Sequence, residues 1–310
     1  MALSVPLKRP QGRARRVARD ARRSWSAYVF ISPGLILFGL FTLFALGFAF
    51  YLSFHDWSVI EKEKPFAGLE NYRDILDDAR FHRATINTFY FTGGSVPLTM
   101  AIGLLIALML NQPIRARGLF RTLYYLPVVT PFVVVAILWK FLYNADFGLF
   151  NYYLLKTRLI DEPLLWLSDK DLAMPSVILM SVYSGIGWAM ILYLAGLQGI
   201  PEELYEAAKV DGAGAWQRFR YVTLPQLAPT TLFLLVISII YSLQVFTQIF
   251  VMTGGGPVER TTTMVYFIYL TAFKFFEMGY ATALAFFLFA MTLVFTLFQL
   301  RLYRRYGAGI

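Results

Sequence analysis

Six long apolar runs constrain what this chain can fold into more than any other feature of its sequence. Each run has 20 to 27 residues, and about 20 helical residues cross the hydrocarbon core of a bilayer. The interiors of the runs contain no charged residue. The two charged residues that fall within a run, Arg121 and Lys140, lie close to the two ends of the third run. The runs are continuous rather than alternating, which favours helices over the strands of a membrane barrel. We therefore predict an all-α, polytopic membrane protein with six transmembrane helices, at residues 28–54, 87–110, 119–143, 172–197, 227–251 and 281–300.

The composition agrees with this class and excludes several kinds of site. Of the residues, 58% are hydrophobic and 15% are charged, whereas about a quarter of the residues of soluble domains are charged. The chain has no cysteine and only two histidines, His55 and His82. Disulfides and thiolate metal sites are therefore excluded, and little remains that could hold zinc. We expect no metal site.

Basic residues are distributed unevenly among the segments between the runs. If the N-terminal tail is cytoplasmic, the cytoplasmic segments contain 17 Lys or Arg and 5 acids, and the outer segments contain 10 Lys or Arg and 14 acids. Cytoplasmic loops of membrane proteins carry an excess of Lys and Arg, so we predict that both termini are cytoplasmic. The basic tail, residues 1–27, then faces the lipid surface. This orientation explains most of the net charge of +9 without a nucleic-acid partner.

The sequence lacks the motifs of common catalytic sites. It contains no Gly-x-x-x-x-Gly-Lys-[Ser/Thr] phosphate loop, no His-Glu-x-x-His and no Gly-x-Ser-x-Gly. Transporters that are coupled to protons or sodium normally bury ionisable residues in their spans, and the interiors of these runs have none. We therefore predict that the chain is not an enzyme and has no catalytic residue, and that energy for any transport comes from another subunit.

A polar stretch, residues 202–225, separates the fourth and fifth runs on the predicted cytoplasmic side. Pro201 suits the first position of a helix, Glu202 and Glu203 complement the positive end of its dipole, and Gly212 is typical of its end. A second helix is predicted over residues 213–222, ended by Pro225. The small residues Ala207, Ala208, Gly212, Ala213 and Gly214 let another protein approach the backbone closely. We interpret the stretch as a docking surface rather than an ordinary loop.

The stretch "EAAKVDGAGAWQRFRYVTLP" resembles the coupling-loop signature of permease subunits of ATP-binding cassette importers. The signature has Glu-Ala-Ala, then Asp-Gly-Ala, an aliphatic residue and Leu-Pro; Val222 stands where isoleucine is common. The segments "NTFYFT", "TGGGPVERTTTMVYFIYLTAF" and "MGYATALAF" resemble the carbohydrate-uptake branch of that family, the maltose, trehalose and glycerol-phosphate type. The resemblance covers nearly the whole chain from about Trp25.

This resemblance implies an importer-permease fold over residues 28–310, with a cytoplasmic coupling loop at residues 198–226. It also implies a complex in a bacterial cell membrane: a second homologous permease, two cytoplasmic ATPase subunits that bind the ATP, and an extracellular solute-binding protein. The chain itself would then need no cofactor. The residues that match the coupling signature, and that would contact the ATPase, are Glu206, Ala207, Ala208, Asp211, Gly212, Ala213, Leu224 and Pro225.

Two polar stripes are candidates for the solute pathway. On a continuous helix Tyr241, Gln244 and Gln248 fall within about 60° of one another. Ser184 and Trp188, with Ser181, do the same in the preceding run. Sugars are bound by planar hydrogen-bonding groups and aromatic faces, so these stripes suit a sugar. The alternative is that the polar groups only join helices to one another, as they do in many membrane bundles.

Three functions stay open at this point. The first is the pathway subunit of an ATP-driven importer of a sugar, such as a di- or oligosaccharide. The second is the same kind of permease for another solute, such as glycerol 3-phosphate or a phosphodiester. The third is an ion channel or membrane enzyme, which the missing intramembrane charges and catalytic motifs disfavour.

Overall fold

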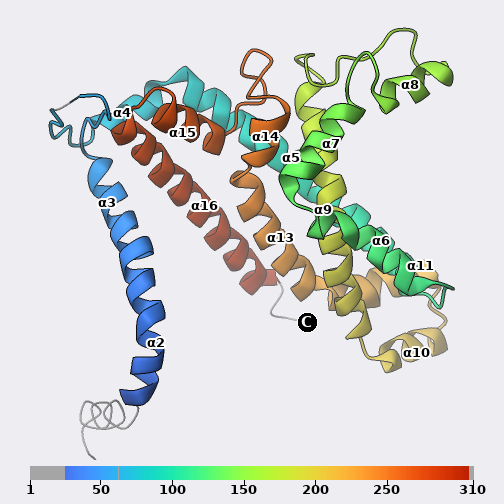
Figure 1. Cartoon of the computed structure of the whole chain (residues 1–310). Helices are drawn as coiled ribbons and strands as arrows, with labels where there is room; N and C mark the ends of the chain where they lie inside the picture. Colours follow the sequence, from blue (N-terminus) through green and yellow to red (C-terminus); the bar gives the residue numbers. More distant parts are fainter. Residues whose placement is uncertain (1–24, 62, 307–310) are drawn as a thin grey trace, which may run out of the picture. The chain divides into compact units, whose positions relative to one another are not determined.

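The computed structural model describes residues 25–61 and 63–306, and regular structure in these ranges is helical apart from isolated bridges. The predicted basic tail, residues 1–27, lies almost entirely outside the described residues. Internal contacts divide the chain into two compact units, with the boundary between Leu52 and Ser53. The prediction that the fold is all-α is confirmed (Figure 1).

The described part of the first unit is one long apolar helix. It consists of α2 (Trp25–Phe38), a π-helical segment η1 (Gly39–Phe44) and α3 (Ala45–Leu52). Residues Tyr28–Leu52 are long and apolar enough to cross a membrane, and large side chains such as Phe30 and Phe41 are exposed on it. A helix that is apolar all round is typical of a membrane span, so this segment matches the first predicted run.

The second unit contains three further unbroken spans: α5 (Ala79–Leu110), α9 (Ala173–Gln198) and α16 (Met278–Tyr306). They correspond to the second, fourth and sixth predicted runs. The shorter helices α4 (Glu70–Asp77), α8 (Leu149–Lys156) and α15 (Met264–Phe273) lie in the connections that the sequence places on the outer side.

The third predicted run is a bent pair rather than one helix. It forms α6 (Arg117–Val129) and α7 (Phe132–Leu142), whose axes differ by 98°. The bend occurs at Thr130, whose ψ of 133° is extended. Pro131 causes this, because a proline disfavours the α conformation of the residue before it. The chain therefore has four unbroken spans, or six if each of its two bent pairs is counted as one.

The fifth predicted run, residues 227–251, also differs from a single helix. It forms α13 (Ala228–Leu243), ends there, and starts again as α14 (Thr247–Met252). The break is held by tertiary contacts, since the Thr263 hydroxyl donates to the carbonyl of Val245 at 3.0 Å and the side chain of Val245 is buried. The second bent pair lies at the other end of α13, where the segment Ala215–Gln226 meets it at 62°.

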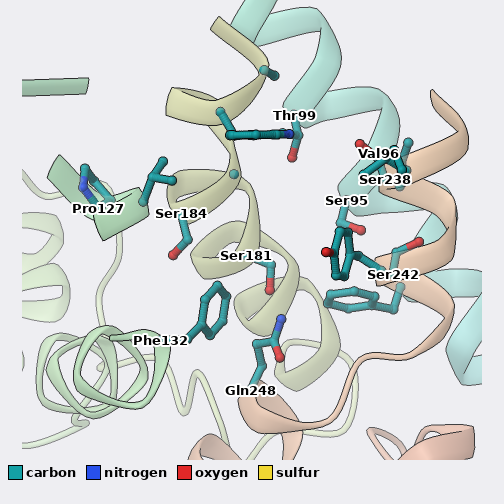
Figure 2. Close-up of a pocket in the computed structure, with 17 residues that line it drawn as sticks. Ser95, Val96, Thr99, Pro127, Phe132, Ser181, Ser184, Ser238, Ser242 and Gln248 are labelled. Atoms are coloured by element: carbon teal, nitrogen blue, oxygen red, sulfur yellow. The ribbon is translucent and has the colours of Figure 1, made fainter. Parts of the chain in front are cut away.

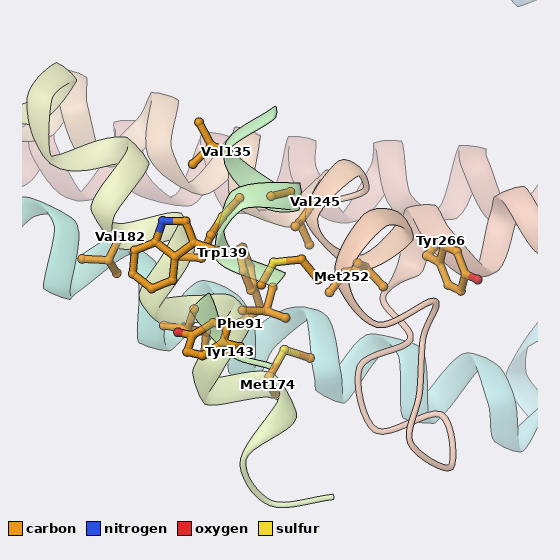
Figure 3. Packing of buried hydrophobic residues seen from close by; sticks show 14 residues of the cluster. Phe91, Val135, Trp139, Tyr143, Met174, Val182, Val245, Met252 and Tyr266 are labelled. Atoms are coloured by element: carbon orange, nitrogen blue, oxygen red, sulfur yellow. The ribbon is translucent and has the colours of Figure 1, made fainter. Parts of the chain in front are cut away.

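The central helix of the second unit is α9, which packs against α5, α6 and α13 (Figure 1). Near its N-terminal end a core cluster forms around Trp139 of α7, Phe91 of α5 and Val177 of α9 (Figure 3). Val245, in the break after α13, and Ile249, in α14, belong to the same cluster. The hydrophobic packing therefore stabilises the broken backbone.

Close approach of α6 to α9 requires a glycine at position 187. A Cβ there would clash with the backbone carbonyl of Tyr124 and lie 2.9 Å from Val128 Cγ2. We expect Gly187→Ala to lower the free energy of unfolding by about 1–3 kcal/mol, the usual cost of overpacking. The matched control is Gly93→Ala, because a Cβ at Gly93 meets nothing within 4 Å. Thermal unfolding in detergent compares the two variants, and equal stability would contradict this account of the α6–α9 contact.

Candidate functional site

The polar segment after α9 begins with a short exposed helix, α10 (Glu202–Val210). Pro201 precedes it in an extended conformation, with ψ of 133°, and Glu202 and Glu203 lie in its first turn. The helix ends at a turn in which Gly212 has φ of +80° and the Ala213 amide donates to the Ala208 carbonyl at 2.8 Å. The predicted short helix and glycine turn are confirmed.

The second predicted helix is longer than expected and contains a π-helical turn. It runs through α11 (Ala215–Arg218), η2 (Phe219–Thr223) and α12 (Leu224–Gln226). The prediction that Pro225 ends it was wrong, because Pro225 lies inside α12. Pro225 has no amide proton for the carbonyl four residues earlier, and the π turn directly before it changes the bonding pattern at that point. Trp216 and Phe219 lie on one face of this segment, with ring centroids 5.5 Å apart.

Most side chains of this segment are exposed and do not pack against the rest of the second unit. Glu206, Ala207, Asp211 and Gly212 are exposed, while Ala208, Ala213, Leu224 and Pro225 are partly buried. Large apolar side chains are exposed beside them, at Val210, Trp216 and Tyr221. Exposed apolar groups rimmed by charged ones are typical of a protein-binding surface. The roles predicted for these residues in contacting an ATPase stay predictions.

A cavity of about 620 Å³ lies between the helices of the second unit (Figure 2). Its walls come from α5, α6, α7, α9, α13 and α14. The polar side chains converge on it from α5, α9, α13 and α14, and aromatic rings complete the wall. None of the lining residues is Asp, Glu, Lys, Arg or His. The polar and aromatic members of the lining are Ser95, Thr99, Ser181, Ser184, Ser238, Tyr241, Ser242, Gln248, Phe91, Phe132 and Trp188.

Three of the five serine hydroxyls that line this cavity, those of Ser181, Ser184 and Ser242, donate to carbonyls of their own helices. Ser181 donates to the Val177 carbonyl at 2.8 Å, and Ser184 donates to the Met180 carbonyl at 3.2 Å. A hydroxyl that donates in this way still has lone pairs that accept. The serines therefore offer acceptors to a bound molecule, while the Gln248 amide supplies donors. Such a lining suits a neutral molecule that has several hydroxyl groups.

Four of the five predicted pathway residues, Ser184, Trp188, Tyr241 and Gln248, line this one cavity. Gln244 does not, because α13 ends at Leu243 and the helical stripe is interrupted there. Gln244 instead lines a separate groove of about 510 Å³ beside α15 and α16. The premise that Gln244 shares a face with its neighbours was therefore wrong, and contact of any of the five with a solute stays a prediction.

Sequence reasoning missed the wall that α5 contributes. Ser95 and Thr99 are four residues apart on that helix, and both line the cavity. Ser238 and Ser242 show the same spacing on α13. Polar residues at i and i+4 in an otherwise apolar run share one helix face, and this signal would have found both pairs.

Two of the motifs quoted above meet in space although they are far apart in the sequence. The Asn87 amide, in "NTFYFT", donates to the carbonyls of Glu259 and Thr262 at 2.9 and 2.8 Å. Arg83 forms an ion pair with Glu259 at 2.6 Å. The glycine-rich loop between α14 and α15 is thus fastened to the N-terminal part of α5.

Comparison with known proteins agrees with this geometry. A family model described as "Binding-protein-dependent transport system inner membrane component" matches residues 99–307. The chain is 35% identical over 286 residues to the trehalose/maltose transport system permease protein of Thermococcus litoralis, which covers 91% of this chain and 95% of that protein. It is 32% identical over 285 residues to the sn-glycerol-3-phosphate transport system permease protein of Pectobacterium atrosepticum, covering 92% and 96%.

A solved structure shows the same fold. It is the crystal structure of a bacterial alginate ABC transporter in complex with an alginate pentasaccharide-bound periplasmic protein. One of its chains matches with a TM-score of 0.81 at 28% identity, over 94% of this chain and 98% of that chain. This likeness confirms the fold that the sequence resemblance implied.

Proposed function

Because this chain belongs to the family of binding-protein-dependent transport system inner membrane components, we propose that it forms the transmembrane pathway of a sugar importer driven by a separate ATPase. The solute crosses by alternating access, and the chain carries the pathway rather than the energy source. The observation that supports this best is the uncharged, hydroxyl-lined cavity at the centre of the second unit.

The chemistry of the cavity supports a neutral sugar over a phosphorylated solute. Its serine hydroxyls offer acceptors, which match the hydroxyl donors of a sugar, and Trp188 and Phe132 offer apolar faces for its ring. A phosphate group needs donors and positive charge, and the lining contains no Lys, Arg or His. The volume of about 620 Å³ is large enough for a disaccharide-sized molecule, since ligand pockets usually have about 300–1,000 Å³.

The exposed helix α10 supports an external energy source. Its sequence carries the coupling signature, and Glu206 and Ala207 are exposed where a soluble protein would contact them. In this proposal two ATPase subunits bind the ATP, and one of them receives α10. The chain needs no cofactor and no catalytic residue of its own, in keeping with the missing phosphate loop.

The remaining partners in this proposal are those that the resemblance to importer permeases implies. A second homologous permease completes the pathway, and a solute-binding protein delivers the sugar from outside. The charge bias of the loops supports a cytoplasmic position for both termini and for α10. The complex then lies in the inner membrane of a bacterial cell as a multi-pass assembly.

Uptake measured with a panel of solutes tests this proposal. The chain is co-purified with its partner subunits, reconstituted in vesicles, and supplied with the binding protein and with labelled disaccharides, oligosaccharides or glycerol 3-phosphate. We expect ATP-dependent uptake of a neutral sugar and none of glycerol 3-phosphate, because the cavity offers no cation to the phosphate. Uptake of the phosphoester alone would contradict the sugar assignment and leave the importer assignment intact.

A further inference from the structure

Helix α10 is held to the rest of the second unit by very few side chains. Seven of its nine residues are exposed, and the other two, Tyr205 and Ala208, are partly buried. None of its side chains is fully buried. A helix with so little packing does not pass on a displacement through a hydrophobic interface. Any force on α10 therefore has to leave it through the backbone at its ends or through these few contacts.

One hydrogen bond joins α10 to the segment that follows it. The hydroxyls of Tyr205 and Thr223 lie 3.0 Å apart, and Thr223 is 5% exposed. Thr223 also lies 3.4 Å from the carbonyl of Arg218, to which its hydroxyl donates; the phenol of Tyr205 is then the donor to Thr223. In the part of the chain that the structure describes, this is the only side-chain hydrogen bond between α10 and another helical segment.

The backbone before α10 is tied to a different element. Gln198, the last residue of α9, accepts from Nη2 of Arg117 and of Arg121 at 2.8 and 3.0 Å when its amide oxygen faces them. These two cations at the start of α6 also complement the negative end of the α9 dipole. The end of α9 is thus fastened to α6, and Pro201 then turns the chain into α10. Movement of α10 relative to α9 is possible at this turn.

The backbone after Thr223 leads directly to the cavity. The Leu227 amide donates to the Thr223 carbonyl at 3.0 Å, which connects the π turn and α12 to the 62° bend before α13. Ser238, Tyr241 and Ser242 of α13 line the cavity. A displacement that reaches Thr223 therefore has a continuous helical path to the cavity wall.

We propose that the hydroxyl pair of Tyr205 and Thr223 transmits the movement of α10 to α12 and α13. Both are positioning residues for ATP-driven transport, because they act through α13 and not on the solute. This inference rests on the proposed function and adds the contact through which ATPase closure changes the cavity. Docking of the ATPase uses the exposed face of α10, so it does not depend on this hydrogen bond.

The test uses the complete importer in vesicles, with ATP hydrolysis and solute uptake measured in the same preparation. Tyr205→Phe and Thr223→Val remove one hydroxyl each and keep the side-chain volume nearly unchanged. For each variant we expect the ATPase to remain bound and to hydrolyse ATP. We expect the amount of ATP consumed per solute molecule to rise about five- to tenfold, which is the size of effect that the loss of one hydrogen bond can produce. The double variant is expected to show no larger rise than either single one, because both remove the same contact.

Two further variants serve as controls. Thr223→Ser keeps the hydroxyl and is expected to restore the wild-type ratio of ATP to solute. Thr282→Val removes a hydroxyl that donates to the carbonyls of Met278 and Gly279 in its own helix, α16, and is expected to leave the ratio of ATP to solute unchanged. An unchanged ratio in Tyr205→Phe, loss of the ATPase from either single variant, or a double variant whose effects multiply would overturn the inference. Absence of ATP-dependent uptake in the wild-type complex would instead overturn the proposed function.

Discussion

Charge reversal at Glu206 is expected to abolish uptake while the chain still inserts in the membrane and still pairs with its second permease. Glu206 is exposed on α10 and forms no salt bridge with the residues that the structure describes, so its carboxylate is available to a partner. Loss of one charge-assisted hydrogen bond costs about 1.5–3 kcal/mol, which weakens binding by roughly 10- to 150-fold. Glu206→Lys adds repulsion to this loss, whereas Glu206→Gln keeps the shape and is expected to fall between it and the wild type.

The turn after α10 provides a second, independent variant of the same surface. Gly212 has φ of +80°, and a Cβ there meets nothing within 4 Å, so strain alone decides the outcome. Gly212→Val forces a β-branched residue into the left-handed region, at a cost of about 1–2 kcal/mol. Gly68→Val is the matched control, because Gly68 also has a left-handed conformation, with φ of +59°, and lies outside the coupling loop.

Co-purification of the ATPase and uptake in the same cells measure both substitutions. We expect less ATPase with Glu206→Lys and with Gly212→Val, and a normal amount with Gly68→Val. If Glu206→Lys and Gly212→Val both transport at the wild-type rate with a full complement of ATPase, the segment is an ordinary loop and the docking proposal is wrong.

Replacing Gln248 by alanine is expected to reduce uptake by about tenfold or more, whereas the same change at Gln244 leaves uptake near the wild-type level. Gln248 lines the cavity, where its amide provides both donors and an acceptor. One hydrogen bond to the solute contributes about 0.5–1.5 kcal/mol, and leaving a buried group of the solute unpaired adds to the loss. Gln244 lies in the groove beside α16 and serves as the matched control.

Initial uptake rates at low solute concentration distinguish the two glutamines, with ATPase co-purification showing that both variants assemble. Equal losses would place the pathway along the helical stripe that the sequence predicted and outside the cavity. Wild-type uptake by both variants would mean that these polar groups only join helices.

Local properties of the chain were sufficient to predict the spans and the exposed helix. The lengths of the apolar runs predicted the membrane-crossing elements, because burying about 20 apolar residues in lipid depends on each segment alone. The bend of the third run was also foreseeable, since Pro131 restricts its own neighbour. The ends of α10 followed from Pro201, the first-turn glutamates and Gly212, whose effects act within a few residues.

Contacts between distant residues decided what the sequence alone left undetermined. The end of α13 at Leu243 depends on the hydroxyl of Thr263 and on the burial of Val245. A periodic sequence pattern shows neither of these two contacts. Because α13 ends at Leu243, Gln244 does not line the cavity. The fastening of the loop after α14 by Asn87 joins residues 172 positions apart.

The coupling loop, residues 198–226, shows the same distinction between what local sequence determines and what tertiary packing determines. The sequence by itself determined that residues 202–210 form an exposed polar helix between two spans, because charge, helix ends and hydrophobicity are local properties. Only the tertiary structure decided that this helix is joined to η2 through Tyr205 and Thr223, and that Ser95 and Thr99 of α5 line the same cavity as Trp188 of α9. The physical reason is that a hydroxyl pair and a cavity wall depend on which helix faces pack together, and many backbone arrangements are compatible with the same pattern of apolar runs.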